Sequence, residues 1–219
     1  MDTNENQIIK NTILFVKETL KNAEGGHDWF HIERVYRTSL VIAKTEKVNP
    51  FIVALGALLH DIADAKFYDG DETVGPKMAK DFLKTQQVTD LVIDEIVYII
   101  DNISFKNSLS NSQTKKISKE LQVIQDADRL DAIGAIGIAR AFNYGGFKNR
   151  VLYNPEIKPQ LNQTKEEYKK SKAPTLNHFY EKLFLLKDMM NTKTGKIMAQ
   201  ERHTYMEDFL KQFYKEWGL

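Results

Sequence analysis

The chain has 219 residues, of which 42% are hydrophobic and 28% are charged, and it contains no cysteine. This length favours a single domain, and the lack of cysteine excludes disulfide bonds, thiolate metal ligands and cysteine nucleophiles. Lysine and arginine total 31 against 30 aspartate and glutamate residues, a net charge of +1 that provides no basic field for a nucleic-acid polymer or an anionic membrane. Any chemistry must therefore come from histidine, acidic residues, lysine and arginine.

Neither a targeting segment nor a membrane span is predicted. The first ten residues are polar and acidic, and the longest apolar stretch, from Phe51 to Leu59, has nine residues. A signal peptide begins with basic residues followed by an apolar segment, and a membrane-spanning helix needs ~20 apolar residues. We therefore expect a cytoplasmic protein without membrane partners, and a homo-oligomer is compatible with the sequence.

Apolar residues recur at spacings of three and four along most of the chain, which is typical of amphipathic helices. The predicted helices cover 8–20, 28–43 with Asp28 as N-cap, 51–63 after Pro50, 73–84, 90–102, 121–142 with Asp126 as a cap, 176–190 and 196–217. Residues 106–119 and 143–174 are predicted to be irregular because polar residues, glycine or proline gather there. The sequence thus predicts an all-α fold of about seven to nine helices in one domain, 1–219.

The placement of histidine and aspartate is the most informative feature of the sequence. His27 and His31 stand four residues apart at a predicted helix start, and His60 is followed by Asp61 inside the apolar segment LGALLHDIADA. A charged pair in such a helix is costly to bury unless it is paired or binds a metal ion. A third segment, QDADRLDAIGA, places Asp128 and Asp131 three residues apart on one helix face.

These three segments, GHDWFHIERV, LLHDIADAKF and QDADRLDAIG, resemble the HD superfamily of metal-dependent phosphohydrolases. The resemblance covers about residues 20–145, with the helices of 174–219 expected to pack onto this core, and it implies an all-α HD domain. It also implies four metal ligands: His31, His60, Asp61 and Asp128. Within the superfamily the sequence is most similar to a bacterial branch of nucleotide pyrophosphohydrolases, including the C-terminal segments HFYEKLFLLKDMMNT and RHTYM.

The resemblance also limits the number of metal ions. Members with two metal ions carry additional histidines between the His-Asp pair and the last aspartate, and this sequence has none between Asp61 and Asp128. We therefore expect one divalent ion. Two imidazoles and two carboxylates suit Mn²⁺, Co²⁺, Ni²⁺, Fe²⁺ or Zn²⁺, and Mg²⁺ is a further candidate.

Further residues are candidates for catalysis and substrate binding. Asp64 shares a helix face with Asp61 and is expected to orient or deprotonate the attacking water, and His27 to contact phosphate or protonate the leaving group. The substrate-binding candidates are Lys66, Lys106, Lys148 and Asp131. Each has a structural alternative: His27 at the helix start, the lysines as solvated charges, and Asp131 paired with Arg34 or Arg129.

The leading functional hypothesis is hydrolysis of nucleoside or deoxynucleoside triphosphates to monophosphate and pyrophosphate. The alternatives within enzymology are a nucleoside monophosphate phosphatase and an alarmone hydrolase, which would use the same metal ion. A weakly catalytic nucleotide-sensing module and an all-α interaction protein are alternatives of other classes. The last of these predicts that the purified protein holds no metal and that no pocket joins His31, His60, Asp61 and Asp128.

Overall fold

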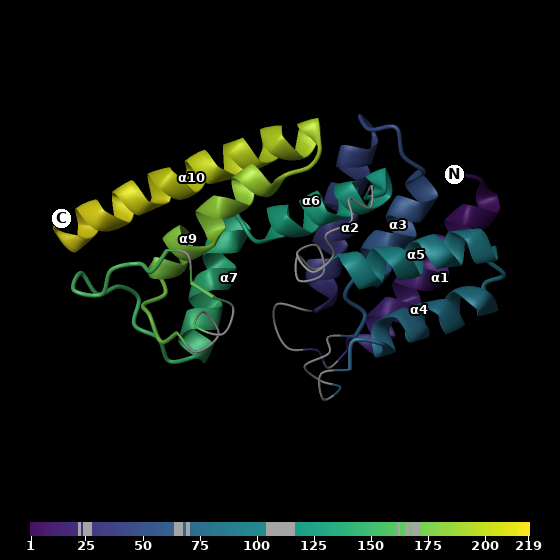
Figure 1. The fold of residues 1–219 in the computed structure, drawn as a ribbon, viewed down its shortest axis with the longest axis horizontal. Coiled ribbons are helices and arrows are strands. Elements are labelled where there is room, and N and C mark those ends of the chain that lie inside the picture. Colours follow the sequence, from purple (N-terminus) through teal and green to yellow (C-terminus); the bar gives the residue numbers. More distant parts are fainter. Residues whose placement is uncertain are drawn as a thin grey trace. The chain divides into compact units, whose positions relative to one another are not determined.

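The structure, a computed structural model of the chain, describes residues 1–21, 23, 28–63, 68, 71–103, 117–161, 163–164, 167 and 171–219. These residues form α-helices and one 3-10 helix without any strand, which confirms the predicted all-α class (Figure 1). The helices are α1 (Thr3–Thr19), α2 (Trp29–Ala43), α3 (Pro50–Leu59), α4 (Val74–Thr85), α5 (Asp90–Asn102), α6 (Lys119–Asp131), α7 (Gly134–Phe147), α9 (Asn177–Glu181), η2 (Leu183–Met189) and α10 (Lys193–Trp217).

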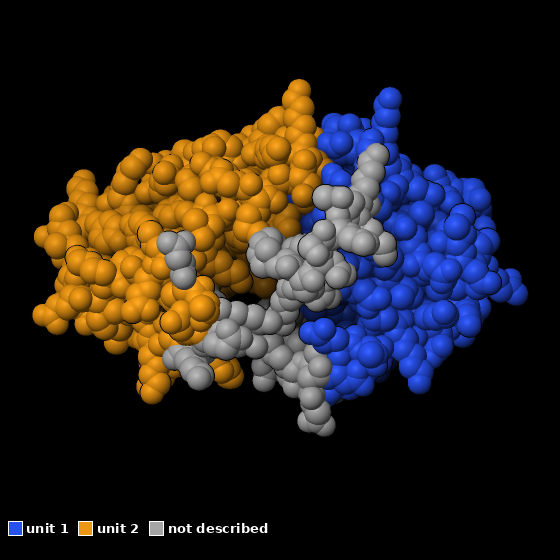
Figure 2. Space-filling view, in the orientation of Figure 1, with its two compact units in different colours: residues 1–128 blue, residues 129–219 orange. Residues whose placement is uncertain are grey.

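The chain forms two compact units, residues 1–128 and residues 129–219 (Figure 2). The boundary falls within α6, whose last three residues belong to the second unit. The single domain expected for residues 1–219 stays a prediction. Across the described residues, no helix has both the length and the apolar character that crossing a bilayer requires.

The first unit is built around α3, which contacts α1, α2 and α5. Pro50 occupies the first turn of α3, and the Asn49 side chain accepts a hydrogen bond from the backbone N–H of Phe51 at 2.9 Å, so the start of the helix is well defined. Every residue of α3 from Val53 to Leu59 is buried. A Cβ on Gly56 would lie 2.7 Å from Cδ1 of Ile124, so this glycine allows α6 to approach α3 closely.

Two of the sequence-based helix predictions need correction. The predicted helix 51–63 ends at Leu59, with His60 as the C-cap residue. The predicted helix 121–142 is two helices, α6 and α7, because the chain turns at Gly134, whose positive φ of 76° suits glycine. Asp126 is not a cap, since it lies fully buried well inside α6, and the Ser118 hydroxyl accepts from the backbone N–H of Leu121 at the start of that helix.

The second unit also differs from the prediction in its element boundaries. The segment 143–174 is not irregular from its start, because α7 continues to Phe147 and takes in Gly145 and Gly146. Gly145 is buried there, and a Cβ on it would lie 2.1 Å from Oγ1 of Thr175. The predicted helix 176–190 is divided into α9 and η2, whereas α10 begins after Thr192, whose hydroxyl accepts from the backbone N–H of Gly195 at 2.9 Å.

Aromatic side chains from α7, α9 and α10 form the core of the second unit. The ring of Phe179 is fully buried and lies 6.0 Å from the rings of both Phe142 and Phe209, measured between centroids. Such ring pairs add to the free energy of burying apolar surface. The C-terminal helices are therefore held together by residues that lie far apart in the sequence.

His178, at the start of α9, makes the stability of the protein depend on pH. Burial, together with the positive charges of Lys182 and Arg150, lowers the pKa of His178 from its ordinary value of 6.5 to about 4. Between these values the unfolded chain binds a proton that the folded protein does not. The free energy of unfolding should therefore fall as the pH is lowered through this range, by at most about 1.4 kcal/mol per pH unit.

Urea unfolding at several pH values between 4 and 6.5 measures this effect. The variant His178→Gln keeps a polar side chain that does not titrate. The difference between the variant and the wild type in how the free energy of unfolding depends on pH therefore isolates the contribution of His178. The expectation would be contradicted if the free energy of unfolding changed with pH by the same amount in the two proteins.

Candidate metal centre

Three of the four predicted metal ligands lie together in the first unit. His31 is the third residue of α2, His60 directly follows the last residue of α3, and Asp128 lies in the C-terminal half of α6. One ligand atom of each residue lies within 4.8 Å of the other two. The packing of these helices thus gathers donors that are 29 and 68 residues apart in the sequence.

The distances define the shape of this cluster. The Asp128 Oδ1 atom lies 3.5 Å from Nε2 of His31 and 3.9 Å from Nε2 of His60. The two imidazole rings are 5.4 Å apart between centroids, with an angle of 66° between their planes. The two histidine nitrogens and the carboxylate oxygen therefore converge on one small volume.

Hydrogen bonds orient the ring of His60 and hold the backbone of His31. The Nδ1–H group of His60 donates to the carbonyl oxygen of Ala57 at 2.9 Å, and because a carbonyl can only accept, the proton resides on Nδ1. This leaves the lone pair of Nε2 for a ligand, as in metal-bound histidines that donate their second N–H to a carbonyl. At the start of α2, the Asp28 carboxylate accepts from the backbone N–H of His31 at 3.0 Å, which confirms Asp28 as the N-cap.

Burial differs strongly among the three residues. The side chains of His31 and His60 are only 4% and 3% exposed, whereas that of Asp128 is 40% exposed. The two buried imidazoles form the enclosed side of the cluster. The partly solvated carboxylate of Asp128 forms its open side. Water and a substrate could reach the centre from the side of Asp128.

The donor set fits a divalent metal ion. Two ligands that each bind one ion at about 2.1 Å are separated by about 3 to 4 Å, depending on the coordination angle. The distances of 3.5 and 3.9 Å from the Asp128 oxygen agree with this range. Imidazole nitrogen and carboxylate oxygen are donors that Mn²⁺, Fe²⁺, Co²⁺, Ni²⁺ and Zn²⁺ accept. The described residues can therefore hold such an ion through His31, His60 and Asp128.

Asp61 is the fourth predicted ligand. It follows His60 in the turn after α3, and its side chain is neither fully buried nor fully exposed. Its carboxylate is not one of the three donors that lie within 4.8 Å of one another in the described part of the chain. Coordination by Asp61 therefore stays a prediction.

The remaining predicted residues are placed as follows. His27, Asp64, Lys66 and Lys106 lie outside the described residues, so their proposed roles stay predictions. Lys148 is exposed at the end of α7, where its ammonium group lies 4.9 Å from the ring centroid of Phe147. A phosphate-binding role for Lys148 also stays a prediction.

Asp131 has a partner that the sequence did not indicate. Its side chain is 4% exposed, and its carboxylate accepts a hydrogen bond from Arg140 of α7, which also donates to the Asp131 carbonyl at 3.3 Å. The predicted alternatives were Arg34 and Arg129, and the Arg129 side chain donates to the carbonyl of Met189. Asp131 and Arg140 are nine residues apart and lie on two different helices, so no helical periodicity in the sequence connects them.

We expect Asp131→Asn to lower the free energy of unfolding by about 2 kcal/mol, because it removes the charge that pairs with Arg140. The loss is smaller than for a fully buried pair since the Arg140 side chain is 30% exposed. Urea unfolding measures it, with the exposed Asp188→Asn as a matched control in the same unit. Equal stability of the two variants would contradict the expectation, and the KM of Asp131→Asn tests the proposed substrate contact separately.

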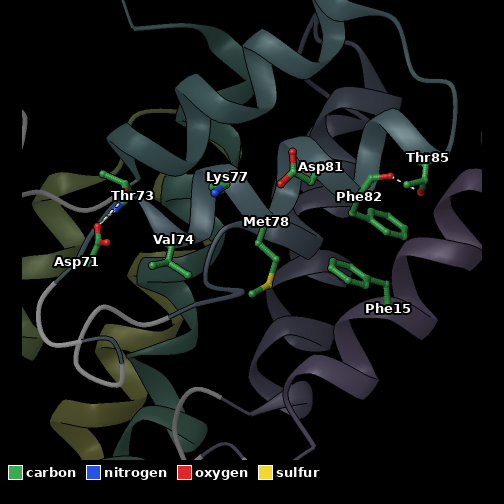
Figure 3. Close-up of a pocket in the computed structure, with 9 residues that line it drawn as sticks. All are labelled: Phe15, Asp71, Thr73, Val74, Lys77, Met78, Asp81, Phe82 and Thr85. Atoms are coloured by element: carbon green, nitrogen blue, oxygen red, sulfur yellow. Dashed lines mark hydrogen bonds between the residues drawn. The ribbon is translucent and has the colours of Figure 1, made fainter.

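A pocket of about 650 Å³ lies elsewhere in the first unit, between one face of α4 and Phe15 of α1 (Figure 3). Its floor is apolar, with Met78 beside the stacked rings of Phe15 and Phe82, whose centroids are 4.0 Å apart. None of the three clustered donors lines it. We assign the chemistry to the donor cluster, because its imidazoles and carboxylate converge on one point and none of them belongs to this pocket.

Comparisons with known proteins agree with the geometry. The profile described as HD domain matches residues 29–133, which include all three clustered donors. Over 211 residues the chain is 38% identical to the uncharacterized protein YpgQ of Bacillus subtilis, covering 92% of this chain and 90% of that protein. The chain therefore belongs to the HD domain family.

Solved structures show the same relationship. An HD-superfamily hydrolase from Bacillus thuringiensis superposes with a TM-score of 0.79 at 42% identity, covering 98% of each chain. Bacillus subtilis YpgQ in complex with ADP superposes with a TM-score of 0.77 at 33% identity, covering 98% of this chain and 97% of that one. This chain thus shares its fold with an HD-superfamily hydrolase.

Proposed function

We propose that this protein is a metal-dependent phosphohydrolase that cleaves nucleoside or deoxynucleoside triphosphates into the monophosphate and pyrophosphate. The observation that carries the proposal is the convergence of the His31 and His60 imidazoles with the Asp128 carboxylate within 4.8 Å. A second observation supports the substrate class, because the related YpgQ has been crystallised with ADP. We expect the base and the phosphates of such a ligand to be recognised here as well.

The proposed mechanism assigns a distinct task to each clustered residue. A divalent ion held there would lower the pKa of a bound water molecule and polarise a phosphoryl oxygen. His60 is oriented by Ala57 so that Nε2 faces away from the backbone, and His31 is fixed at the capped start of α2. Asp128 supplies the negative charge on the open side. Their rigid placement reduces the reorganisation that binding would otherwise require.

The predicted residues around this centre complete the proposal. Asp64 would orient or deprotonate the attacking water, and Asp61 would be the fourth ligand. His27 would contact phosphate or protonate the leaving group. The charge of the polyphosphate would be balanced by lysine side chains, for which the candidates are Lys66, Lys106 and Lys148.

The experiment that tests the proposal is product analysis with reconstituted protein. Metal-free protein is loaded with Mn²⁺, Co²⁺, Ni²⁺, Mg²⁺ or Zn²⁺ and incubated with a panel of nucleotides, and the products are identified by phosphorus NMR. Monophosphate together with pyrophosphate is the expected result. Orthophosphate released from monophosphates would replace the proposal with a phosphatase, and pyrophosphate released from an alarmone would replace it with an alarmone hydrolase. Binding without turnover under every condition would leave a nucleotide-sensing module.

A further inference from the structure

A second pocket, of about 310 Å³, lies within the second unit and is here called the tyrosine pocket. Three segments that are distant in the sequence line it: the chain after α7, α9 and the last turns of α10. Its lining residues are Tyr153, Pro155, Ile157, Lys158, Pro159, Asn177, Tyr180 and Tyr214. The volume is at the lower end of the range found for small-molecule sites, which are about 300–1,000 Å³.

The walls of the tyrosine pocket are aromatic and held in place by one another. The ring of Tyr153 meets that of Tyr214 edge to face at 5.4 Å and that of Trp217 at 5.2 Å. The hydroxyl groups of Tyr180 and Tyr214 are 3.2 Å apart and share one hydrogen bond. Three tyrosine rings around a small volume provide flat apolar surface on which a planar ring can pack, together with hydroxyl groups that can bind its polar edge.

The polar groups of the pocket are neutral except for one. Burial, with the hydrogen bond to Tyr180, raises the pKa of Tyr214, so its hydroxyl stays protonated. Asn177 is 1% exposed and donates from Nδ2 to the carbonyl of Ile157 at 3.0 Å. Among the described residues that line the pocket, Lys158 alone carries a formal charge, and it is exposed.

Two hydrogen bonds attach the chain segment that carries Lys158 to α9. The first is the bond from Asn177 to Ile157, and the second runs from the backbone N–H of Gln160 to the Glu181 carboxylate at 3.0 Å. Lys158 lies between these two attachment points. The ammonium group therefore extends from a fixed backbone at the edge of the aromatic walls, where it would attract an anion.

We propose that the tyrosine pocket binds a small ligand that combines a planar aromatic ring with one anionic group. The ring would pack among Tyr153, Tyr180 and Tyr214, and the anion would pair with Lys158. Nucleoside monophosphates and aromatic carboxylates share this chemistry. Because all lining residues belong to the second unit, this site differs from the candidate metal centre and does not depend on the proposed hydrolysis.

Fluorescence titration of the full chain tests the proposal. The chain has two tryptophans, so Trp29→Phe leaves Trp217, which contacts Tyr153, as the sole reporter. The titrations use adenosine 5′-monophosphate, adenosine, ribose 5-phosphate and benzoate, with EDTA present so that no metal ion contributes. We expect the monophosphate or benzoate to quench the fluorescence of Trp217 in a saturable way. Adenosine, which lacks the charge, should bind roughly tenfold more weakly.

Two variants in the same background decide whether the response comes from this pocket. Lys158→Glu should weaken binding of the anionic ligand by tenfold or more, roughly, because an attraction becomes a repulsion. Lys196 is also exposed and lies at the other end of α10, so Lys196→Glu is the matched control and should bind as the Trp29→Phe protein does. Both substitutions lie on the surface, so neither should affect folding.

The same titrations also distinguish between the two classes of ligand. Tighter binding of adenosine 5′-monophosphate than of benzoate identifies a nucleotide site, and the reverse order identifies an aromatic carboxylate site. The proposal is overturned if none of the four ligands gives saturable quenching, if adenosine binds as tightly as its monophosphate while benzoate does not bind, or if Lys158→Glu binds as the control does.

Discussion

Replacing Asp128 by asparagine is expected to remove metal binding and hydrolysis while the fold stays intact. The amide keeps the shape of the side chain but loses the charge and the stronger oxygen donor, and only the two neutral imidazoles of the cluster would remain. We expect metal affinity to fall by about 100-fold or more and turnover by about 1,000-fold or more. The fold should tolerate the change because the Asp128 side chain is 40% exposed, so the new amide can bind water.

Titration of metal-free protein with Mn²⁺, followed by electron paramagnetic resonance, measures the affinity directly. Asp94→Asn is the matched control, since Asp94 is an exposed aspartate on α5 of the same unit and undergoes the same chemical change. Thermal unfolding of both metal-free variants verifies their folding. The ligand assignment fails if Asp128→Asn binds Mn²⁺ as tightly as Asp94→Asn does.

Replacing Gly137 by alanine is expected to give the largest loss of stability among single methyl additions in α7. A Cβ at this position would lie 2.2 Å from the carbonyl oxygen of Ala132 and 2.5 Å from its carbonyl carbon. Backbone atoms cannot rotate away as the end of a side chain can, so the turn between α6 and α7 would have to open. We expect the free energy of unfolding to fall by about 3 kcal/mol or more.

Gly146→Ala is the matched control for this prediction, because Gly146 lies in the same helix and nothing lies within 4 Å of the added Cβ. That substitution should raise the free energy of unfolding by about 0.5–1 kcal/mol through the higher helix propensity of alanine. Urea unfolding of both variants gives the two values. Equal effects of the two substitutions would show that the close approach to Ala132 does not constrain the fold.

The sequence predicted those parts of the fold that depend on local pattern. The bounds of α5 agree with the prediction at both ends, and Asp28 caps α2 as expected, because periodicity and capping act over a few residues. The division between α6 and α7 escaped prediction. Residues 121–142 remain apolar and helical in pattern, and the extended backbone of Ile133 together with the positive φ of Gly134 interrupts them.

The candidate site was predicted in part, and the limit has a physical reason. The resemblance to the HD superfamily predicted His31, His60 and Asp128 as ligands, and their meeting depends on the packing of α2, α3 and α6. Their orientation was not predictable, because the acceptor for His60 is a backbone carbonyl, and every residue has one. The pairing of Asp131 with Arg140 is similar, since no periodic spacing connects the two.

The contrast in burial between the two histidines and Asp128 bears on the identification of the physiological ion. Two of the three ligands are held by helix packing and backbone hydrogen bonds, so the polypeptide should stay native after chelation. Each divalent ion would then raise the melting temperature according to its own affinity and concentration, since it binds only the native state. A thermal-shift series over Mn²⁺, Fe²⁺, Co²⁺, Ni²⁺, Zn²⁺ and Mg²⁺ can therefore rank the ions before any substrate is known.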